Sequence, residues 1–300
     1  MLDLPQFTDQ TCRVSAAAGD VEFLDVGEGL PVLYFHGTGA GAHSMPPLER
    51  PLLEDGCRLI IPNRPGYGGT PLGDRRSAAD CADLTAALLD RLDLERVVVI
   101  GTSGGGPAAA AFAARHPRRC AGLVMQCAQS HAWDHSRWLP ERQRWLYPLL
   151  RYRRLRPALN AAHRLAGRLT PASVGPVIRF FSGPRFDDLR DDEAARRLMD
   201  QLITSSARCA RQPAGVDNDL EILFDPASTV PPNSIECPTL VIHDRADPVV
   251  PFCHAEWTRQ AVTQAHWTEH TLGGHLIWFG RDARAMHAER MRFVREVFGR

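Results

Sequence analysis

The sequence contains no lysine, and every one of its 35 basic residues is arginine. Asp and Glu also total 35, so the formal net charge is zero. Nothing in this overall charge indicates a nucleic-acid partner. Together with the abundant alanine, the arginine bias is typical of a GC-rich bacterial genome, although the arginines remain available to bind carboxylates or phosphates.

Long apolar runs are absent too. No stretch approaches the ~18 apolar residues of a membrane-spanning helix, and we therefore expect no stable membrane insertion. The N-terminal segment MLDLPQFTDQ has neither the basic start nor the apolar centre of a signal peptide. The prediction is a cytoplasmic protein.

Paired cysteine motifs are also missing. The eight cysteines lie at positions 12, 57, 81, 120, 127, 209, 237 and 253, and none forms a C-x-x-C pair. This scatter favours buried free thiols in a reducing compartment over disulfides or a zinc site. We predict no metal and no other cofactor.

Alternating strand-like and helix-like segments make up most of the chain. They predict right-handed crossovers and a mostly parallel sheet within an α/β fold. Helices are expected from the N-cap Ser77 to about Leu92, after the glycines near 105, and from about 252 and 282. The expected strands are 13–17, 21–26, 32–35, 58–62, 97–101, 121–128, 238–244 and 267–271.

The middle third breaks this alternation. Residues 129–235 lack convincing buried strands and carry irregular helical segments rich in Trp, Arg and Pro. We predict that this stretch is a helical cap inserted between two strands of one sheet. The domains are then a core of residues 1–128 and 236–300 and a cap of residues 129–235.

The most informative segment is Gly101-Thr102-Ser103-Gly104-Gly105, which joins the β-branched run Val97–Ile100 to an alanine-rich helical run. This is G-x-S-x-G between a strand and a helix. A strained turn there would hold the Ser103 hydroxyl clear of the sheet, with Gly101 and Gly105 leaving it room. The start of the helix would aim free N–H groups at an oxyanion, chiefly that of Gly104.

A nucleophilic serine needs a base within hydrogen-bond reach, and the base needs an orienting acid. In a parallel sheet, such groups gather at the carboxyl ends of strands. His275 follows two glycines just beyond the last expected strand and is the predicted base. His270, inside that strand, is the alternative.

The predicted acid is Asp247, which follows a buried strand by a few residues and precedes Pro248. Asp244, at the strand end itself, is its near rival, and Asp134 is a more distant one. The order Ser103, Asp247, His275 is the order of the nucleophile-elbow fold.

A second oxyanion donor is expected after the strand at 32–35. The loop His36-Gly37-Thr38-Gly39 permits close backbone approach, and the Thr38 N–H would be the donor. His36 and Gly37 would support it. One such donor is commonly worth ~3 kcal/mol of transition-state stabilisation.

These motifs resemble those of the α/β-hydrolase superfamily, in the group with a cap after the sixth strand. The resemblance covers about residues 20–128 and 236–298. Besides the motifs above, it rests on Arg64-Pro65-Gly66-Tyr67-Gly68 and on Gly274-His275. It implies a mostly parallel eight-stranded sheet flanked by helices, with one antiparallel edge strand.

Two residues depart from the family pattern. Asn63 stands where Asp is more common, and Asp244 stands where Gly is more common. An extra carboxylate at 244 would change the electrostatic environment of His275, so Asp244 is also a candidate modulator of that histidine.

The predicted cap has one unusual stretch. Between Arg137 and Arg168 it carries nine arginines and a single acid, Glu141. The functional interpretations are an anion-seeking lid, a pocket for a carboxylate-bearing substrate, or a surface that touches acidic lipid. We favour a simpler one, an amphipathic helix whose arginines are solvated and partly paired with the acidic run at 187–193.

The sequence thus predicts a carboxylic ester hydrolase with a Ser103–His275–Asp247 triad and a small-molecule ester substrate. The same triad would serve a C–C bond hydrolase, a proline-iminopeptidase-like aminopeptidase or a cofactor-independent perhydrolase. A ligand-binding receptor on the same fold is the non-enzyme alternative. Monomer and homodimer both remain open.

Overall fold

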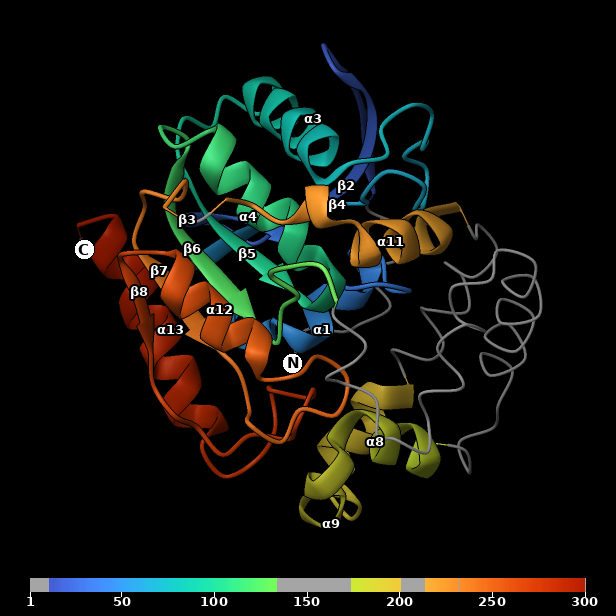
Figure 1. The fold of residues 1–300 in the computed structure, drawn as a ribbon, viewed down its shortest axis with the longest axis vertical. Helices are drawn as coiled ribbons and strands as arrows, with labels where there is room; N and C mark the ends of the chain where they lie inside the picture. The colour runs from blue at the N-terminus through green and yellow to red at the C-terminus, as the bar shows by residue number, and fades with distance from the viewer. Residues whose placement is uncertain (1–10, 134–173, 201–213, 232, 300) are drawn as a thin grey trace.

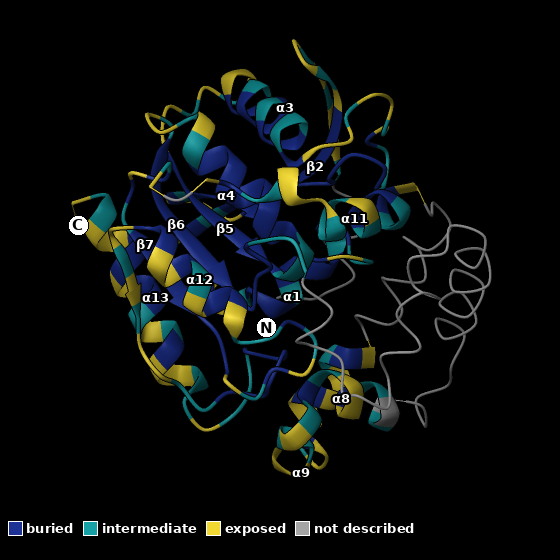
Figure 2. Cartoon of the chain, viewed as in Figure 1, coloured by how far each residue is buried: buried dark blue, intermediate teal, exposed yellow. Residues whose placement is uncertain are grey.

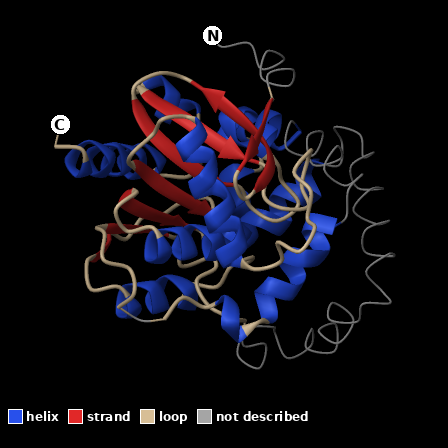
Figure 3. Cartoon of the chain, turned by 90° about the horizontal axis from the view of Figure 1, so that it is seen from above, coloured by secondary structure: helices blue, strands red, loops and turns tan. Residues whose placement is uncertain are grey.

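The computed structural model describes residues 11–133, 174–200, 214–231 and 233–299. At its centre lies an eight-stranded sheet with the order β1-β2-β4-β3-β5-β6-β7-β8, between helices on both faces (Figures 1 and 3). The strands are β1 Cys12–Ala16, β2 Gly19–Val26, β3 Leu30–Phe35, β4 Cys57–Pro62, β5 Val97–Thr102, β6 Cys120–Gln126, β7 Thr239–Ile242 and β8 Ala265–Trp267.

The sheet is parallel from β4 across to β8, while β2 runs antiparallel to both β1 and β4. The antiparallel strand is therefore second from the edge, and the resemblance was wrong to imply an antiparallel edge strand. The reason is the tight turn at 17–18, which forces β1 to run back along β2 and so in the direction of the other strands.

The central strands are buried on both faces. All residues of β5 and β6 are buried, as expected for parallel strands covered on two sides. Alternate β5 residues enter opposite cores: Val97 and Val99 join one cluster, and Val98 and Ile100 join the other. Figure 2 shows the buried sheet beneath helices whose outer faces are exposed.

Two sets of helices cover these faces. The first core packs against α3 Ala78–Arg91 and α4 Gly106–Arg115, and the second against α1 Met45–Leu48, α2 Arg50–Glu54 and α13 Ala283–Val297. Helix α3 begins at the predicted N-cap, where Ser77 and Asp80 form a reciprocal capping box. Helix α12 spans Cys253–Ala261 and contacts β7 and β8.

Between β6 and β7, the described chain contains helices and no strand. These are α8 Val174–Ser182, the 3₁₀ turn η6 Gly183–Arg185, α9 Phe186–Leu189, a helical stretch at 193–200, α11 Ala214–Phe224 and the 3₁₀ turn η7 Pro226–Ser228. The predicted fold class, with a helical insertion after the sixth strand, is confirmed. Asp134 and the arginine-rich stretch 137–168 lie outside the described residues.

One strand was predicted at the wrong place. The last strand is Ala265–Trp267 rather than 267–271, since beyond Trp267 the chain leaves the sheet and His270 Nε2 contacts Glu289 Oε2 on α13 at 2.6 Å.

The seven described cysteines are free thiols, as predicted. Five of them are buried, whereas Cys12 and Cys253 are exposed. No helix in the described ranges is both long and apolar enough to cross a membrane.

Candidate active site

Ser103 stands at a sharp turn between β5 and α4. Its φ is +52°, a left-handed conformation that is unusual for a residue other than glycine and typical of strained functional turns. The flanking glycines are sterically required: a Cβ at Gly101 would lie 2.5 Å from Ala109 Cβ, and one at Gly105 would overlap the Phe35 carbonyl oxygen. The elbow therefore depends on close packing of β3, β5 and α4.

His275 reaches Ser103 from the loop between β8 and α13. Its Nε2 lies 3.1 Å from Ser103 Oγ, and its Nδ1 lies 2.8 Å from Asp247 Oδ2. With Nδ1–H donated to the carboxylate, the Nε2 lone pair faces the serine hydroxyl. Phe181 of α8 supports the histidine twice, because its carbonyl accepts the His275 N–H at 2.9 Å and its ring stacks on the imidazole.

The Asp247 side chain is fully buried and tightly held. Its Oδ1 accepts the backbone N–H groups of Val249 and Val250 at 2.8 and 2.9 Å. His243 Nε2 lies 3.4 Å from the other oxygen, but burial lowers the pKa of His243, so that ring is neutral and donates to the Val250 carbonyl at 2.8 Å. Asp247 thus keeps its charge directed at His275.

Thr38 and Gly104 face each other beside Ser103. A Cβ at Gly37 would lie 3.1 Å from Ser103 Cβ, and one at Gly104 would lie 3.2 Å from Thr38 N. Within the described chain, neither the Thr38 nor the Gly104 N–H donates to a turn, loop or cap hydrogen bond. Two donors are therefore available next to the hydroxyl.

His36 fixes the loop that carries Thr38. Arg64 N–H donates to His36 Nε2 at 3.2 Å, so the proton sits on Nδ1 and goes to the Gly37 carbonyl at 2.9 Å. Burial, assisted by the Arg64 charge, lowers the pKa of His36 well below its usual range. The neutral ring orients the peptide that precedes Thr38.

Comparison with known proteins identifies the family. A model of the alpha/beta hydrolase fold family matches residues 31–280. The chain belongs to that family. It is 27% identical over 279 residues to a Bacillus subtilis protein described as an uncharacterized hydrolase, covering 88% of this chain and 91% of the relative.

Two further likenesses bear on the activity. The 2-hydroxymuconate semialdehyde hydrolase of Pseudomonas sp. strain CF600 is 25% identical over 292 residues, covering 89% of this chain and 92% of that enzyme. A solved alpha/beta hydrolase fold protein from Nakamurella multipartita is 28% identical, with a TM-score of 0.75 and coverage of 97% of this chain and 100% of that one. The protein is a hydrolase of the alpha/beta fold.

Asp244, the rival acid, occupies a different place in this hydrolase. Its Oδ2 accepts from Leu272 N at 2.9 Å and Gly274 N at 3.3 Å, and Arg185 of η6 approaches the same oxygen at 3.3 Å. Among the described residues, the polar partners of Asp244 do not include the His275 ring. It instead ties the loop that carries His275 to β7 and to the helical insertion.

Asp219, on α11, was missed by the sequence analysis. Its buried carboxylate forms an ion pair with Arg64 and accepts a hydrogen bond from Thr38. Those partners lie 155 and 181 positions away along the chain, so no local pattern pairs them. The Arg64–Gly68 motif was noticed only as part of the family resemblance.

Three side chains could in principle hold a metal. The ligand atoms of His131, Cys253 and His254 lie within 4.8 Å of one another. However, His254 Nδ1 accepts from Ser130 N at 3.3 Å, and the rings of His131 and His254 pack at a tilt of 34° with centroids 4.1 Å apart. A tetrahedral zinc ion with Zn–N bonds of about 2.1 Å would hold such rings roughly 5 Å apart. We assign the cluster to side-chain packing.

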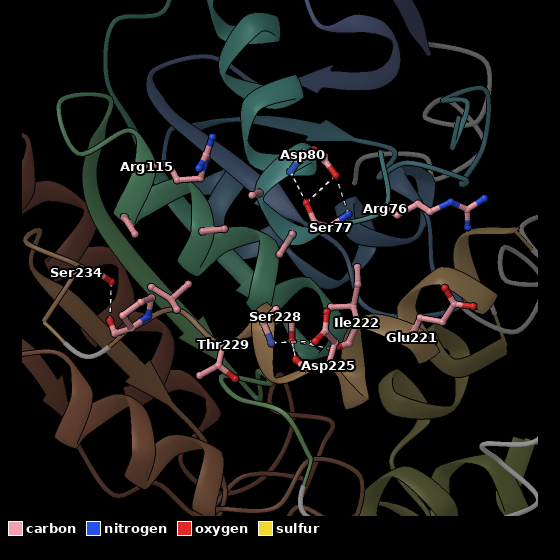
Figure 4. Close-up of a pocket in the computed structure, with 17 residues that line it drawn as sticks. Arg76, Ser77, Asp80, Arg115, Glu221, Ile222, Asp225, Ser228, Thr229 and Ser234 are labelled. Carbon is pink, nitrogen blue, oxygen red and sulfur yellow. Dashed lines mark hydrogen bonds between the residues drawn. The ribbon is translucent and has the colours of Figure 1, made fainter. Parts of the chain in front are cut away.

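A pocket of about 640 Å³ is lined by residues other than the triad (Figure 4). It lies between the start of α3, the side of α4, helix α11 and η7, with Ser77, Arg115 and Ile222 among its lining residues. None of Ser103, Asp247 and His275 lines it. Helix α11 is thus shared between this pocket and the neighbourhood of Thr38.

Proposed function

We propose that the protein is a serine hydrolase that cleaves a small-molecule carboxylic ester through an acyl-enzyme intermediate. The observation that carries the proposal is the continuous contact from Ser103 Oγ to His275 Nε2 and from His275 Nδ1 to Asp247. The spacing suits proton transfer from a hydroxyl to a neutral imidazole held by a carboxylate.

Acylation begins when Ser103 Oγ attacks the ester carbonyl carbon while His275 Nε2 takes the hydroxyl proton. The imidazolium is stabilised by Asp247, which also holds the tautomer. The carbonyl oxygen becomes an oxyanion and accepts the N–H groups of Thr38 and Gly104. Collapse of the tetrahedral intermediate breaks the C–O bond, and His275 gives its proton to the departing alcohol.

Deacylation repeats these steps with water. His275 Nε2 takes a proton from a water molecule that attacks the acyl carbon, and the same two N–H groups stabilise the second oxyanion. Collapse returns the proton from His275 to Ser103 Oγ and releases the carboxylic acid.

A panel of p-nitrophenyl esters of increasing acyl length tests this proposal, with a fluorophosphonate probe of the serine. We expect turnover of at least one ester and one probe bound per chain at Ser103. A chain that takes up no probe and cleaves no ester would be a ligand-binding protein on the same fold, and the proposal would be wrong.

A second candidate is hydrolysis of a C–C bond by the same triad. The observation that favours it is the likeness to the 2-hydroxymuconate semialdehyde hydrolase over most of both chains. 2-Hydroxymuconate semialdehyde itself is the test substrate. If its kcat/KM exceeds that of the best p-nitrophenyl ester by tenfold or more, this candidate replaces ester cleavage. Cleavage of a prolyl anilide in preference to both would favour the aminopeptidase.

A further inference from the structure

The Asp219 carboxylate lies on α11 and is about 5% exposed. It accepts four hydrogen bonds: from Arg64 Nη1 and Nη2 at 2.6 Å each, from Tyr67 OH at 2.6 Å and from Thr38 Oγ1 at 2.8 Å. One of these bonds reaches Oδ1 and three reach Oδ2, and the fork from Arg64 fixes the orientation of the carboxylate. The position of α11 is thereby tied to these three side chains.

Each partner of Asp219 also holds the loop at 36–39. Arg64 donates its Nε–H to the His36 carbonyl at 2.9 Å. Tyr67 OH, while donating to Asp219, accepts the Gly39 N–H at 3.2 Å. Thr38 is bound to Asp219 directly, so the loop is held before, at and after the residue whose N–H is the proposed oxyanion donor.

The charges in this cluster support each other. Burial alone would lower the pKa of Arg64, but the Asp219 charge outweighs it and raises that pKa above its usual range. Burial and the same negative charge raise the pKa of Tyr67 well above 10. Arg64 is therefore charged and Tyr67 remains a donor at neutral pH.

Thr38 connects Asp219 to the turn that carries Ser103. A Cβ at Gly104 would overlap Thr38 Oγ1, so the hydroxyl that binds Asp219 lies directly against Gly104, which carries the other proposed oxyanion donor. Rotation of Thr38 about its backbone would move its N–H away from Ser103 and its side chain into Gly104.

We infer that Asp219 is a positioning residue, through which helix α11 of the insertion sets the oxyanion hole by holding Thr38, Arg64 and Tyr67. The inference rests on the proposed function, because it assigns a purpose to the Thr38 N–H. It adds that the hole is assembled by both the core and the insertion. A buried ion pair is weak support for stability alone, so geometry at Thr38 is the property to measure.

The main test is Asp219→Asn with a p-nitrophenyl ester. We expect kcat to fall about 10²-fold, the effect of losing one oxyanion donor, with KM within threefold. Affinity for an arylboronic acid, which forms a tetrahedral adduct at serine, should fall in parallel. Affinity for the carboxylic acid product should stay unchanged. A purely structural role would lower Tm without lowering kcat and boronic-acid affinity selectively.

Two further sets of variants keep the test decisive if Asp219→Asn does not fold. Thr38→Val removes only the hydroxyl and leaves the Arg64–Asp219 pair, so it should reproduce the loss of kcat, whereas Thr38→Ser should lose much less. Asp25→Asn is the matched control, because Asp25 accepts a similar fork from Arg58 at 2.8 and 2.6 Å between β2 and β4. It should lower Tm and leave kcat unchanged.

The inference is overturned if Asp219→Asn folds and retains the parent kcat. Equal kcat for Thr38→Val and Thr38→Ser overturns it as well. These failures differ from failure of the proposed function, in which the parent protein itself takes up no fluorophosphonate and cleaves no ester. If the parent acts on a C–C bond instead, the same variants are compared on that substrate, since it also passes through an oxyanion.

Discussion

Ser103 combines a positive φ with a hydrogen bond to His275, and replacing its hydroxyl is the most direct test of the site. Ser103→Ala should lower kcat by about 10⁶-fold, as loss of a triad nucleophile does elsewhere, and abolish fluorophosphonate uptake. Thermal stability should change little, because the turn is held by its neighbours. Ser15→Ala, at an exposed serine bonded to Asp20, is the control. More than a tenth of parental activity in Ser103→Ala would exclude it as nucleophile.

The two carboxylates after β7 are distinguished at the same scale. Asp247→Asn should lower kcat about 10⁴-fold, because an amide at that position favours the wrong imidazole tautomer. Asp244→Asn should cost far less in kcat and instead lower Tm, since Asp244 binds the backbone of the His275 loop. Steady-state kinetics and thermal melts of both variants decide the point. Reversed kinetic effects would make Asp244 the acid.

At the scale of elements, the elbow depends on how closely β3 and α4 approach. Gly105→Ala would place a methyl group against the Phe35 carbonyl oxygen, and overpacking of this kind costs roughly 1–3 kcal/mol. We expect a lower unfolding free energy in urea and a large loss of kcat, because the turn that carries Ser103 must shift.

The matched control for that variant is Gly175→Ala on α8. A Cβ there meets nothing within 4 Å, and alanine is the better helix former by about 1 kcal/mol. Its stability should equal or slightly exceed that of the parent. If Gly105→Ala behaves like Gly175→Ala, crowding does not explain the glycine at the elbow.

At the scale of the whole molecule, three buried neutral histidines make stability depend on pH. Burial lowers the pKa of His36 and of His243, and lowers that of His254 from 6.5 to about 2. In the unfolded chain these rings take up protons below about pH 6.5, whereas burial opposes protonation of the folded rings. Stability is therefore fully present above about pH 6.5 and falls as the pH drops, with a slope of roughly 1.4 kcal/mol per pH unit for a ring that, like His254, stays neutral when folded.

Urea unfolding between pH 7.5 and 5 measures this slope. In His254→Gln, the slope of the free energy of unfolding against pH should be shallower by the contribution of one ring, roughly 1.4 kcal/mol per pH unit below pH 6.5. His266→Gln, on the exposed side of β8, should leave the slope unchanged. Equal slopes in the parent and His254→Gln would mean that the buried ring does not stay neutral.

Local patterns allowed most of the sheet and the elbow to be predicted. The β-branched run before Gly101, the small residues at the turn and the Ser77–Asp80 capping box act within a few positions, so steric and hydrogen-bond preferences reveal them directly. The limits of the cap at 129 and 235 stay a prediction. The role of the arginines between 137 and 168 also stays open, since they lie outside the described residues.

By itself, the sequence determined the fold class, the strand–turn–helix at Ser103 and the order of the candidate triad residues, because each depends on neighbours in the chain. Only the tertiary structure decided which carboxylate meets His275 and that Asp219 meets Thr38 and Arg64. Residues in those pairs lie 28 to 181 positions apart, and sheet register and loop paths, which no local preference encodes, bring them together.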